Sequence, residues 1–236
     1  MRLPRLVVKF HRWLGLVLGI QVILWLSGGF VMSVLPLGKV RGEDRAAGAA
    51  DAPFTAADTL LAPLAAAQRL GIAELDGARL DRRLGRPVWH LDTAAGLVVA
   101  DAATGDRLPA IAADGARAVA EADYAGTAPV AMVALQTEPS VETRGHTPPL
   151  WRVDFADGRR TTIYVDPATG KVAARRNTLW RVFDVFWMLH IMDYRARDDF
   201  NHPLLVGSAA AAWFLATSGA WLVVLWLRRR ARARRA

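Results

Sequence analysis

Residues 149–171, PLWRVDFADGRRTTIYVDPATGK, repeat in outline an earlier segment, residues 87–106, PVWHLDTAAGLVVADAATGD. Both segments run from a Pro through a Trp and an Asp to a glycine turn, and then through a β-rich stretch to Asp-x-x-Thr-Gly. In both, the Trp and the residue two positions later are apolar and alternate with polar residues, which is the period of a half-buried strand. The repetition therefore predicts two small units of antiparallel strands in tandem.

Two turn signals in the second copy support short antiparallel strands. Asp157-Gly158 is a hairpin signal, because Asp and Gly tolerate the positive φ values of a tight turn. Asp166-Pro167-Ala168-Thr169-Gly170 predicts a second turn, in which Pro presets φ and Gly supplies the left-handed residue. We interpret Trp89 and Trp151 as core residues of their strands.

A helix is predicted before each set of strands. In the first unit Thr55 and Asp58 resemble a capping box, and Gly71 ends an apolar pattern. In the second unit the pattern runs from about Asp114 to Gly126. Residues 136–148, QTEPSVETRGHTP, are polar and contain proline, so we expect a loop between the helix and the strands of the second unit.

Two uncharged stretches flank this region. Trp13 to Gly38 and His202 to Leu227 each contain 26 residues and no Asp, Glu, Lys or Arg. A helix of that length measures ~39 Å, enough to cross a hydrocarbon core of about 30 Å with some tilt. We therefore expect two transmembrane helices. The first stretch is longer than the apolar part of a signal peptide and is followed by charges instead of a cleavage site, so we expect an uncleaved anchor.

The distribution of charge predicts the orientation in the membrane. Ten of the 30 basic residues lie before the first apolar stretch or after the second, and the segment between them holds 20 basic and 22 acidic residues. Lys and Arg beside membrane spans mark the cytoplasmic side, so both termini are predicted in the cytoplasm and the middle of the chain outside. We do not expect nucleic acid as a partner, because the folded middle is slightly acidic.

The segment before the last apolar stretch, residues 177–201, contains too many charges to span. Arg181 and Asp184 interrupt its apolar run, and we expect them to pair with each other. The segment is predicted to form a short helix and a turn at the outer membrane boundary, and Pro203 is predicted to open the second span. Its aromatic residues match an interfacial belt: Trp180, Trp187 and Tyr194.

The predicted fold class is a membrane protein of α+β type, with two transmembrane helices flanking an external domain of two tandem units. The predicted order is a cytoplasmic segment over residues 1–12, transmembrane helix 1 over 13–35, a linker over 36–52, unit 1 over 53–112, unit 2 over 113–176, an interfacial helix and turn over 177–201, transmembrane helix 2 over 202–227 and a basic cytoplasmic tail over 228–236.

The repeated Trp-x-[Leu/Val]-Asp and Asp-x-x-Thr-Gly motifs resemble PepSY repeats. Residues 11–33, HRWLGLVLGIQVILWLSGGFVMS, and residues 189–195, LHIMDYR, resemble the PepSY-associated transmembrane proteins of bacterial inner membranes. The resemblance covers nearly the whole chain and implies PepSY-like units in the periplasm. Larger members, with about four spans, resemble ferric-siderophore reductases that carry b-type haem, and the PepSY module itself is proposed to inhibit peptidases. This chain departs from the larger members because it has only two spans.

Three histidines near the membrane boundaries are candidate ligands of haem b. His190 and His202 lie at the outer end, twelve residues apart across a turn, so they can converge on one iron. His11 lies at the inner end, ~30 Å away, and would need a second chain. The resemblance places His190 on the Leu-His motif of the family. The alternative is that these histidines bond to carboxylates or cap helices, with His11 contacting lipid headgroups.

The other residue types exclude several chemistries. The chain has no cysteine, which excludes thiol catalysis, iron–sulfur clusters and covalent c-type haem. It carries no HExxH, GxSxG or Walker sequence, and we predict neither catalytic residues nor a metal site. His90 is expected to face solvent on a strand, and His146 to lie in the polar loop.

These features predict an inner-membrane-anchored PepSY-domain protein that acts as a periplasmic binding or accessory module and is not an enzyme by itself. The alternative is a b-type haem protein of electron transfer or ferric-siderophore reduction, and a second alternative is a peptidase inhibitor. The predicted partners are the lipid bilayer and either another membrane protein or a second copy of the chain. Gly15 and Gly19 would allow another helix to approach the first span closely.

Overall fold

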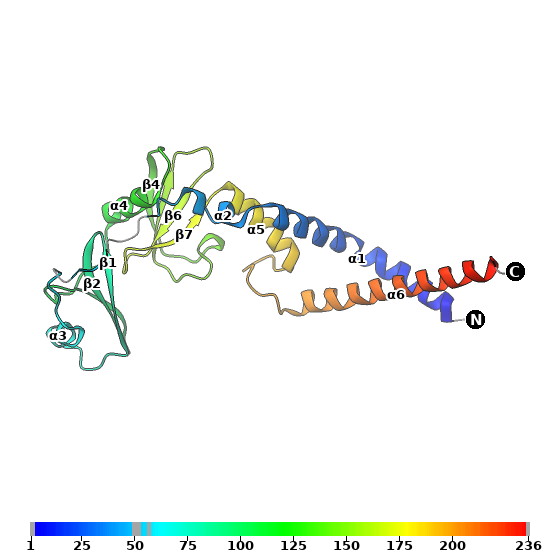
Figure 1. Cartoon of the computed structure of the whole chain (residues 1–236), viewed down its shortest axis with the longest axis horizontal. Coiled ribbons are helices and arrows are strands. Elements are labelled where there is room, and N and C mark those ends of the chain that lie inside the picture. The colour runs from blue at the N-terminus through cyan, green and yellow to red at the C-terminus, as the bar shows by residue number, and fades with distance from the viewer. Residues whose placement is uncertain (1–2, 49–52, 56–57, 235–236) are drawn as a thin grey trace. The chain divides into compact units, whose positions relative to one another are not determined.

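The computed structural model describes residues 3–48, 53–55 and 58–234 of the chain, and it shows an α+β protein with two compact units. The helical unit consists of Met1–Pro36 together with Val182–Ala236. The repeat domain consists of Leu37–Arg181 and holds all the strands found in the described residues. Figure 1 shows both units, with most of their elements labelled.

The first repeat is a three-stranded antiparallel sheet with one short helix. Its strands β1 (Gly77–Arg83), β2 (Arg86–Thr93) and β3 (Gly96–Asp101) lie in the order β1-β2-β3, and helix α3 (Pro63–Arg69) precedes them. Because strand side chains alternate between faces, every second residue of β2 reaches the core beside α3. This small core consists of Ala67, Leu91 and Ala100, with the half-buried Trp89 packed against it.

The second repeat is larger and has the same order of elements. Helix α4 (Ala113–Asp123) is followed by β4 (Val130–Gln136), β5 (Leu150–Phe155), β6 (Thr162–Val165) and β7 (Val172–Arg176), which pair in chain order. The core between α4 and the sheet is closed by Tyr124 and Phe155, whose ring centroids are 4.1 Å apart. It contains Ile111, Ala116, Ala120, Tyr124, Val153, Phe155, Ile163 and Val165.

The two tryptophans that revealed the repetition make the same bond. The indole nitrogen of Trp89 donates to the carbonyl of Leu61 at 3.0 Å, and that of Trp151 donates to the carbonyl of Ile111 at 2.8 Å. Each acceptor lies two residues before the helix of its repeat. The bond therefore ties each helix to the second strand of its own sheet, and the prediction that the tryptophans are structural is confirmed.

The two Asp-x-x-Thr-Gly turns also have the same geometry. In the first, Asp101 Oδ1 accepts the backbone N–H groups of Ala103 and Thr104, and Gly105 has φ 76°. In the second, Asp166 Oδ1 accepts those of Ala168 and Thr169, and Gly170 has φ 68°. A short carboxylate that bonds the backbone two and three residues ahead, followed by a left-handed glycine, is what such a turn requires.

Two details of the first and second repeats differ from expectation. The helix of the first repeat begins at Pro63 and not near Thr55, whose N–H donates to Asp58 Oδ2 at 2.7 Å in a local turn before it. Strand β4 was not predicted. Because it lies between α4 and β5, residues 136–148 connect two strands and not a helix and a strand. That connection contains the 3-10 turn η2 (Val141–Thr143).

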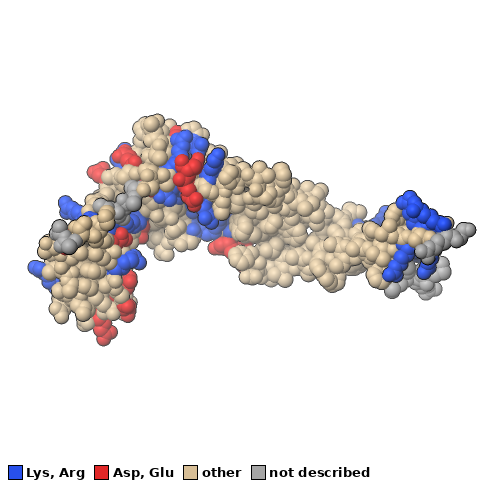
Figure 2. Space-filling view, in the orientation of Figure 1, with Lys and Arg blue, Asp and Glu red and all other residues tan. Residues whose placement is uncertain are grey.

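The helical unit contains α1 (Leu3–Val34), α5 (Thr178–Ile191, which begins in the repeat domain) and α6 (Pro203–Ala233). The segments Arg5–Val34 and Pro203–Ala233 are long and apolar enough to cross a membrane. Most of their large apolar side chains are exposed, and Leu18 is the one buried among the described residues; apolar side chains all round a long helix are typical of a membrane span. In Figure 2 these helices are largely uncharged, with blue gathered at the end that carries the termini.

Two short helical segments precede the repeats. Residues Leu37–Val40 form the short helix α2, and Glu43–Arg45 form the 3-10 turn η1. The side-chain amide of Asn177 donates to the carbonyl of Lys39 at 2.9 Å, and this bond joins α2 to the residue just before α5. The beginning and the end of the repeat domain therefore lie together.

Candidate functional site

His190 lies near the end of α5, against one face of α1. Its Nδ1 atom is buried and has no hydrogen-bond partner. A Cβ atom added to Gly28 would lie 3.5 Å from that nitrogen, so the missing side chain of Gly28 leaves room for the imidazole. Of the predicted haem ligands in the described chain, His190 is the one with a ring nitrogen buried and unbonded.

Polar side chains bond the last carbonyl groups of α5, which no helical N–H can reach. Gln21 donates to the carbonyl of Leu189 at 3.2 Å, and Trp25 donates to that of His190 at 2.7 Å. Both donors belong to α1, and they lie about two turns and one turn before Gly28. The α1 face that receives His190 therefore also holds the end of α5 in place.

His202 joins two helix ends. Its Nε2 lies 2.9 Å from the carbonyl oxygen of Ile191, and its Nδ1 accepts the backbone N–H of Leu205 at 3.4 Å as the N-cap of α6. The acceptor at Nε2 and the donor at Nδ1 together define a neutral imidazole with its proton on Nε2. Both ring nitrogens are occupied, so the structure favours the helix-capping alternative over a haem ligand.

His11 also has a protein partner. Its Nδ1 lies 2.8 Å from the hydroxyl oxygen of Ser218, and that hydroxyl donates to the carbonyl of Leu215 at 2.9 Å. The imidazole packs on Gly219, where an added Cβ would lie 3.0 Å from its Cε1. His11 thus fills a notch between α1 and α6, and no structural feature brings it together with His190 or His202 in the described residues.

The turn between α5 and α6 is organised by two carboxylates. Asp184 is buried and pairs with Arg197, so the predicted pair between Arg181 and Asp184 is wrong. Trp187 donates to the carbonyl of Arg197 at 3.0 Å. Backbone N–H groups, that of Arg195 foremost, bond the Asp193 carboxylate and lower its pKa to about 2. Asp193 therefore stays ionised at all physiological pH values.

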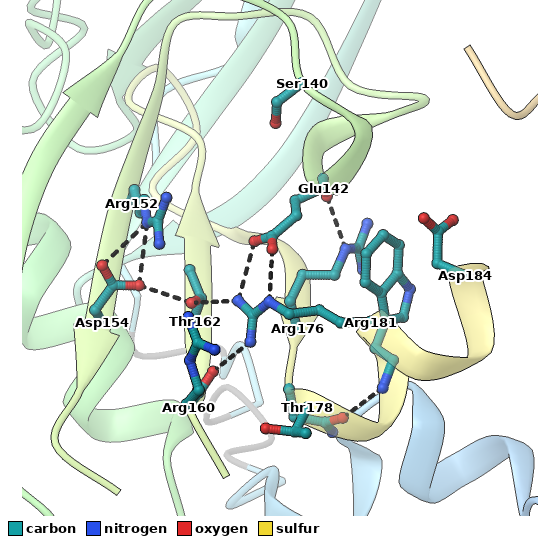
Figure 3. Close-up of polar contacts among 12 residues, drawn as sticks. Ser140, Glu142, Arg152, Asp154, Arg160, Thr162, Arg176, Thr178, Arg181 and Asp184 are labelled. Atoms are coloured by element: carbon teal, nitrogen blue, oxygen red, sulfur yellow. Dashed lines mark hydrogen bonds and ion pairs between the residues drawn. The ribbon is translucent and has the colours of Figure 1, made fainter. Parts of the chain in front are cut away.

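A polar network covers the face of the second sheet that α4 leaves open (Figure 3). The guanidinium of Arg181, in the first turn of α5, donates to Glu142 from Nε at 2.7 Å and to Thr162 from Nη2 at 3.1 Å. Thr162 donates in turn to Asp154 Oδ1 at 2.7 Å, and Arg152 Nε donates to both oxygens of that carboxylate. These bonds fasten the start of α5 to strands β5 and β6.

Glu142 accepts hydrogen bonds from three residues of this network. Besides Arg181, the hydroxyl of Tyr164 donates to Glu142 Oε2 at 2.9 Å, and Arg176 Nε donates to its backbone carbonyl at 2.7 Å. Burial alone would raise the pKa of Glu142, but the bonds from Arg181 and Tyr164 outweigh burial and hold that pKa below its usual range. Burial and the neighbouring carboxylate raise the pKa of Tyr164.

His90 is buried at 1% exposure, so the prediction that it faces solvent is wrong. Alternation along β2 correctly placed His90 on the face opposite Trp89, but that face of the sheet is also buried at His90. Arg79 Nη2 lies 3.0 Å from His90 Nδ1, and His90 Nε2 has no partner. Burial lowers the pKa of His90, and Arg79 and Lys171 act in the same direction against Asp81 and Asp92. His90 is therefore a neutral core imidazole.

A cleft of about 460 Å³ is lined by residues of both repeats. The tip of the β1–β2 hairpin contributes Leu84, which is half exposed and adopts φ 51°. Helix α4 contributes Val119 and Ala122, and the start of β7 contributes Val172. Three cations stand around this apolar lining, and each has a carboxylate partner: Arg82 with Asp58, Lys171 with Asp81, and Arg175 with Asp123.

The cleft has the dimensions and lining of a ligand site. Binding sites for small ligands and peptide side chains commonly enclose about 300–1,000 Å³ and are mainly apolar with a few polar groups. The charges at this cleft balance, so they offer hydrogen bonds to a ligand without favouring a strongly anionic one. In the described residues no group of three or more His, Asp or Glu side chains is placed to hold a metal ion.

Sequence reasoning missed both the cleft and the Glu142 network. Glu142 lies in a polar loop with nothing to mark it, and its bonding partners are separated from it along the chain by 22 to 39 residues. The cleft residues come from three segments whose proximity depends on how the two repeats pack. Comparison with known proteins does not help, because no family model, curated protein or solved structure matches this chain.

Proposed function

We propose that this chain is an inner-membrane-anchored, PepSY-like binding module, with both termini in the cytoplasm and the repeat domain in the periplasm. The proposal rests above all on the apolar cleft lined by both repeats. The two candidate spans flank the repeat domain and support the membrane anchor. The arginines after Leu227 support the cytoplasmic position of the C-terminus.

The ligand that fits this cleft is a short polypeptide segment with apolar side chains. Leu84, Val119 and Val172 supply apolar contacts, and a methyl-sized side chain at Ala122 leaves the space open. Arg175 at the rim can bond a backbone carbonyl of such a segment, because a guanidinium carries five N–H donors and Asp123 binds Arg175 through Nε and Nη2. This chemistry suits a module that captures a peptide or docks on an unfolded partner, without cleaving it.

Filling the cleft with a large side chain tests whether peptides bind there. The full chain in lipid nanodiscs should bind a panel of fluorescein-labelled apolar pentapeptides, such as Ala-Leu-Val-Leu-Ala, measured by anisotropy against empty nanodiscs. Ala122→Trp places an indole in the cleft and should weaken binding at least tenfold. Ala103→Trp, at an exposed alanine of the first Asp-x-x-Thr-Gly turn, is the matched control. Equal binding by the two variants, or none by the natural chain, would contradict the proposal.

Haem binding is a second candidate function, favoured by the unbonded Nδ1 of His190. The surroundings fit only part of a haem site. His202 uses both ring nitrogens for helix ends, and His11 bonds Ser218, so no second axial imidazole is at hand within one chain. A haem held by two histidines of one chain does not fit, and a haem here would rely on His190 alone.

Absorption spectroscopy separates the two functions. The chain is expressed with ample haem, purified in mild detergent and scanned for a Soret band. A band that His190→Ala removes and His202→Ala retains would support the haem candidate. The absence of any band from the natural chain would end it and leave the binding module as the remaining proposal.

A further inference from the structure

Strand β4 forms an open edge of the second sheet. It pairs only with β5, at one end of the order β4-β5-β6-β7, in the part of the chain that the structure describes. Its sequence, VAMVALQ, has no charge and no proline. An unprotected edge of this kind presents a row of backbone N–H and C=O groups to any strand that can pair with it.

The other edges of the repeat domain are protected. Strand β1, the corresponding edge of the first repeat, carries Arg79, Asp81, Arg82 and Arg83 among its seven residues. Along β3, residues 106–108 bond the backbone at Asp101 and Val99. Strand β7 carries two arginines. Charges, covering segments and bulges are the usual devices that prevent pairing between edges; β4 has only the register shift between Val130 and Met132, at its start.

The side chains of β4 suit a partner strand on both faces. Met132 and Leu135 are each 46% exposed, although both are large and apolar. Val133 packs toward the core beneath α4, and alternation places Leu135 on the same face and Met132 with Ala134 on the other. The register shift between Val130 and Met132 interrupts the strand, so the regular part is Met132–Gln136.

We propose that β4 pairs with β4 of a second copy of this chain, antiparallel and with Ala134 on the two-fold axis. In that register Met132 faces Gln136, Val133 faces Leu135 and Ala134 faces Ala134. No like charges oppose one another, and apolar side chains meet on the α4 face. The two four-stranded sheets then form one continuous sheet across the dimer.

A cysteine scan tests this register, because the natural chain has no cysteine. Directly opposed residues of antiparallel strands have Cα atoms about 4.5–5.5 Å apart, within the range that a disulfide spans. One position away from the axis, equivalent residues are about 8 Å apart and cannot be bridged. Under mild oxidation of the full chain in nanodiscs or membranes, Ala134→Cys should give at least fivefold more cross-linked dimer than Val133→Cys or Leu135→Cys.

Matched variants exclude other sources of a dimer. Ala78→Cys, an exposed alanine on the charged edge β1, should cross-link as weakly as the flanking positions. Adding Leu135→Lys to Ala134→Cys should reduce the cross-linked dimer at least fivefold, whereas adding Leu97→Lys, on the covered strand β3, should not. Equal cross-linking at positions 78, 133 and 134, or no effect of Leu135→Lys, would overturn the proposal.

The result is independent of the proposed peptide-binding function. The yield of cross-linked dimer reports only on pairing at the β4 edge, and none of the substituted residues lines the cleft. A dimer held solely by the long helices would persist in the Leu135→Lys variant and show no maximum at position 134. If β4 instead bound an extended apolar peptide and no second copy, the Ala134→Cys variant would stay monomeric under oxidation.

Discussion

Glu142 is the residue through which the start of α5 is attached to the second sheet. Its carboxylate accepts both Arg181 and Tyr164, and its backbone carbonyl accepts Arg176. Bonds between charged groups contribute about 1.5–3 kcal/mol when they are shielded from water. The half-buried position of Glu142 makes its ionisation part of the stability of the repeat domain.

Glu142→Gln should lower the free energy of unfolding of the repeat domain by about 1–3 kcal/mol at pH 7, because the amide cannot replace the ionic bonds to Arg181. The folded-state pKa of Glu142 is lowered, so its contribution is present above the unfolded pKa and lost as the pH falls through the folded value. Denaturant titrations should therefore show a large difference between variant and natural chain at pH 7 and a small one at pH 3. Glu138→Gln, in the same loop, is the control.

His90 should make the repeat domain sensitive to mild acid. Its pKa is lowered by burial, so below about pH 6.5 the unfolded chain binds a proton that the folded chain does not, and stability falls by up to about 1.4 kcal/mol per pH unit until the folded pKa is reached. His90→Leu should reduce the loss of stability between pH 7.5 and pH 5.5. The exposed His146→Leu should leave it unchanged, and an equal loss in all three chains would refute the expectation.

At the scale of elements, two turns of the first repeat, the β1–β2 hairpin and the Asp-x-x-Thr-Gly turn, depend on their glycines to different degrees. Gly85 and Gly105 both have positive φ, at 80° and 76°. An added Cβ meets nothing within 4 Å at Gly85, but at Gly105 it lies 3.2 Å from Leu61 Cδ1 and 3.4 Å from the backbone of Ala66. Gly105 thus allows α3 to approach its turn.

Gly105→Ala should destabilise the repeat domain more than Gly85→Ala. Both substitutions place Cβ in a left-handed backbone, at a cost of about 1–2 kcal/mol. The crowding against α3 adds about 1–3 kcal/mol at Gly105 only. Thermal unfolding followed by near-ultraviolet circular dichroism compares the two, and equal melting temperatures would show that α3 does not pack on this turn as described.

His202→Ala should loosen the junction between α5 and α6. The variant removes the N-cap of α6 and the partner of the Ile191 carbonyl, and loss of an N-cap costs about 1 kcal/mol. Because a loss of about 1 kcal/mol corresponds to a factor of about five to ten, hydrogen exchange at the Leu205 amide should accelerate by that factor. His146→Ala serves as the control, and an unchanged rate at Leu205 would show that the imidazole is not its cap.

Local patterns predicted the elements that have strong local signals. The two Trp motifs, the turn at Asp166–Gly170, the helix from Asp114 and the start of α6 at Pro203 were found because each depends on residues close together in the chain. Strand β4 was missed because its alanines and the polar loop after it carry no strand or hairpin signal. Helix α3 was predicted to begin too early because Thr55 and Asp58 bond each other in a turn.

At the scale of the whole molecule, the proposed topology has a direct test. An alkaline phosphatase reporter, which is active only outside the cytoplasm, should be inactive when fused after Ala236. The same reporter inserted at Gly145, in the exposed β4–β5 loop where an added side chain meets nothing within 4 Å, should be active. The reverse result would show that the arginine-rich tail lies outside, against the bias of basic residues toward the cytoplasm.

The candidate sites depend on long-range packing, which the sequence does not reveal. Alternation assigned His90 to the face opposite Trp89, but its burial and the nearby charge of Lys171, which pairs with Asp81, depend on residues distant in the chain. The histidines near the ends of the long apolar helices were recognised as a group, yet Ser218 and the carbonyl of Ile191 decide the bonding of His11 and His202. Only coordinates distinguish an imidazole that caps a helix from one with a free nitrogen.

The long β4–β5 connection is the main difference between the two repeats. In the first repeat the equivalent strands are joined by Leu84 and Gly85 alone, whereas in the second the connection is long enough to carry Glu142. The first repeat has a two-residue hairpin at this place, and the second has a connection that attaches the helix that follows. The shared order of helix and strands therefore supplies the scaffold, and the difference between the two repeats supplies the specialised part.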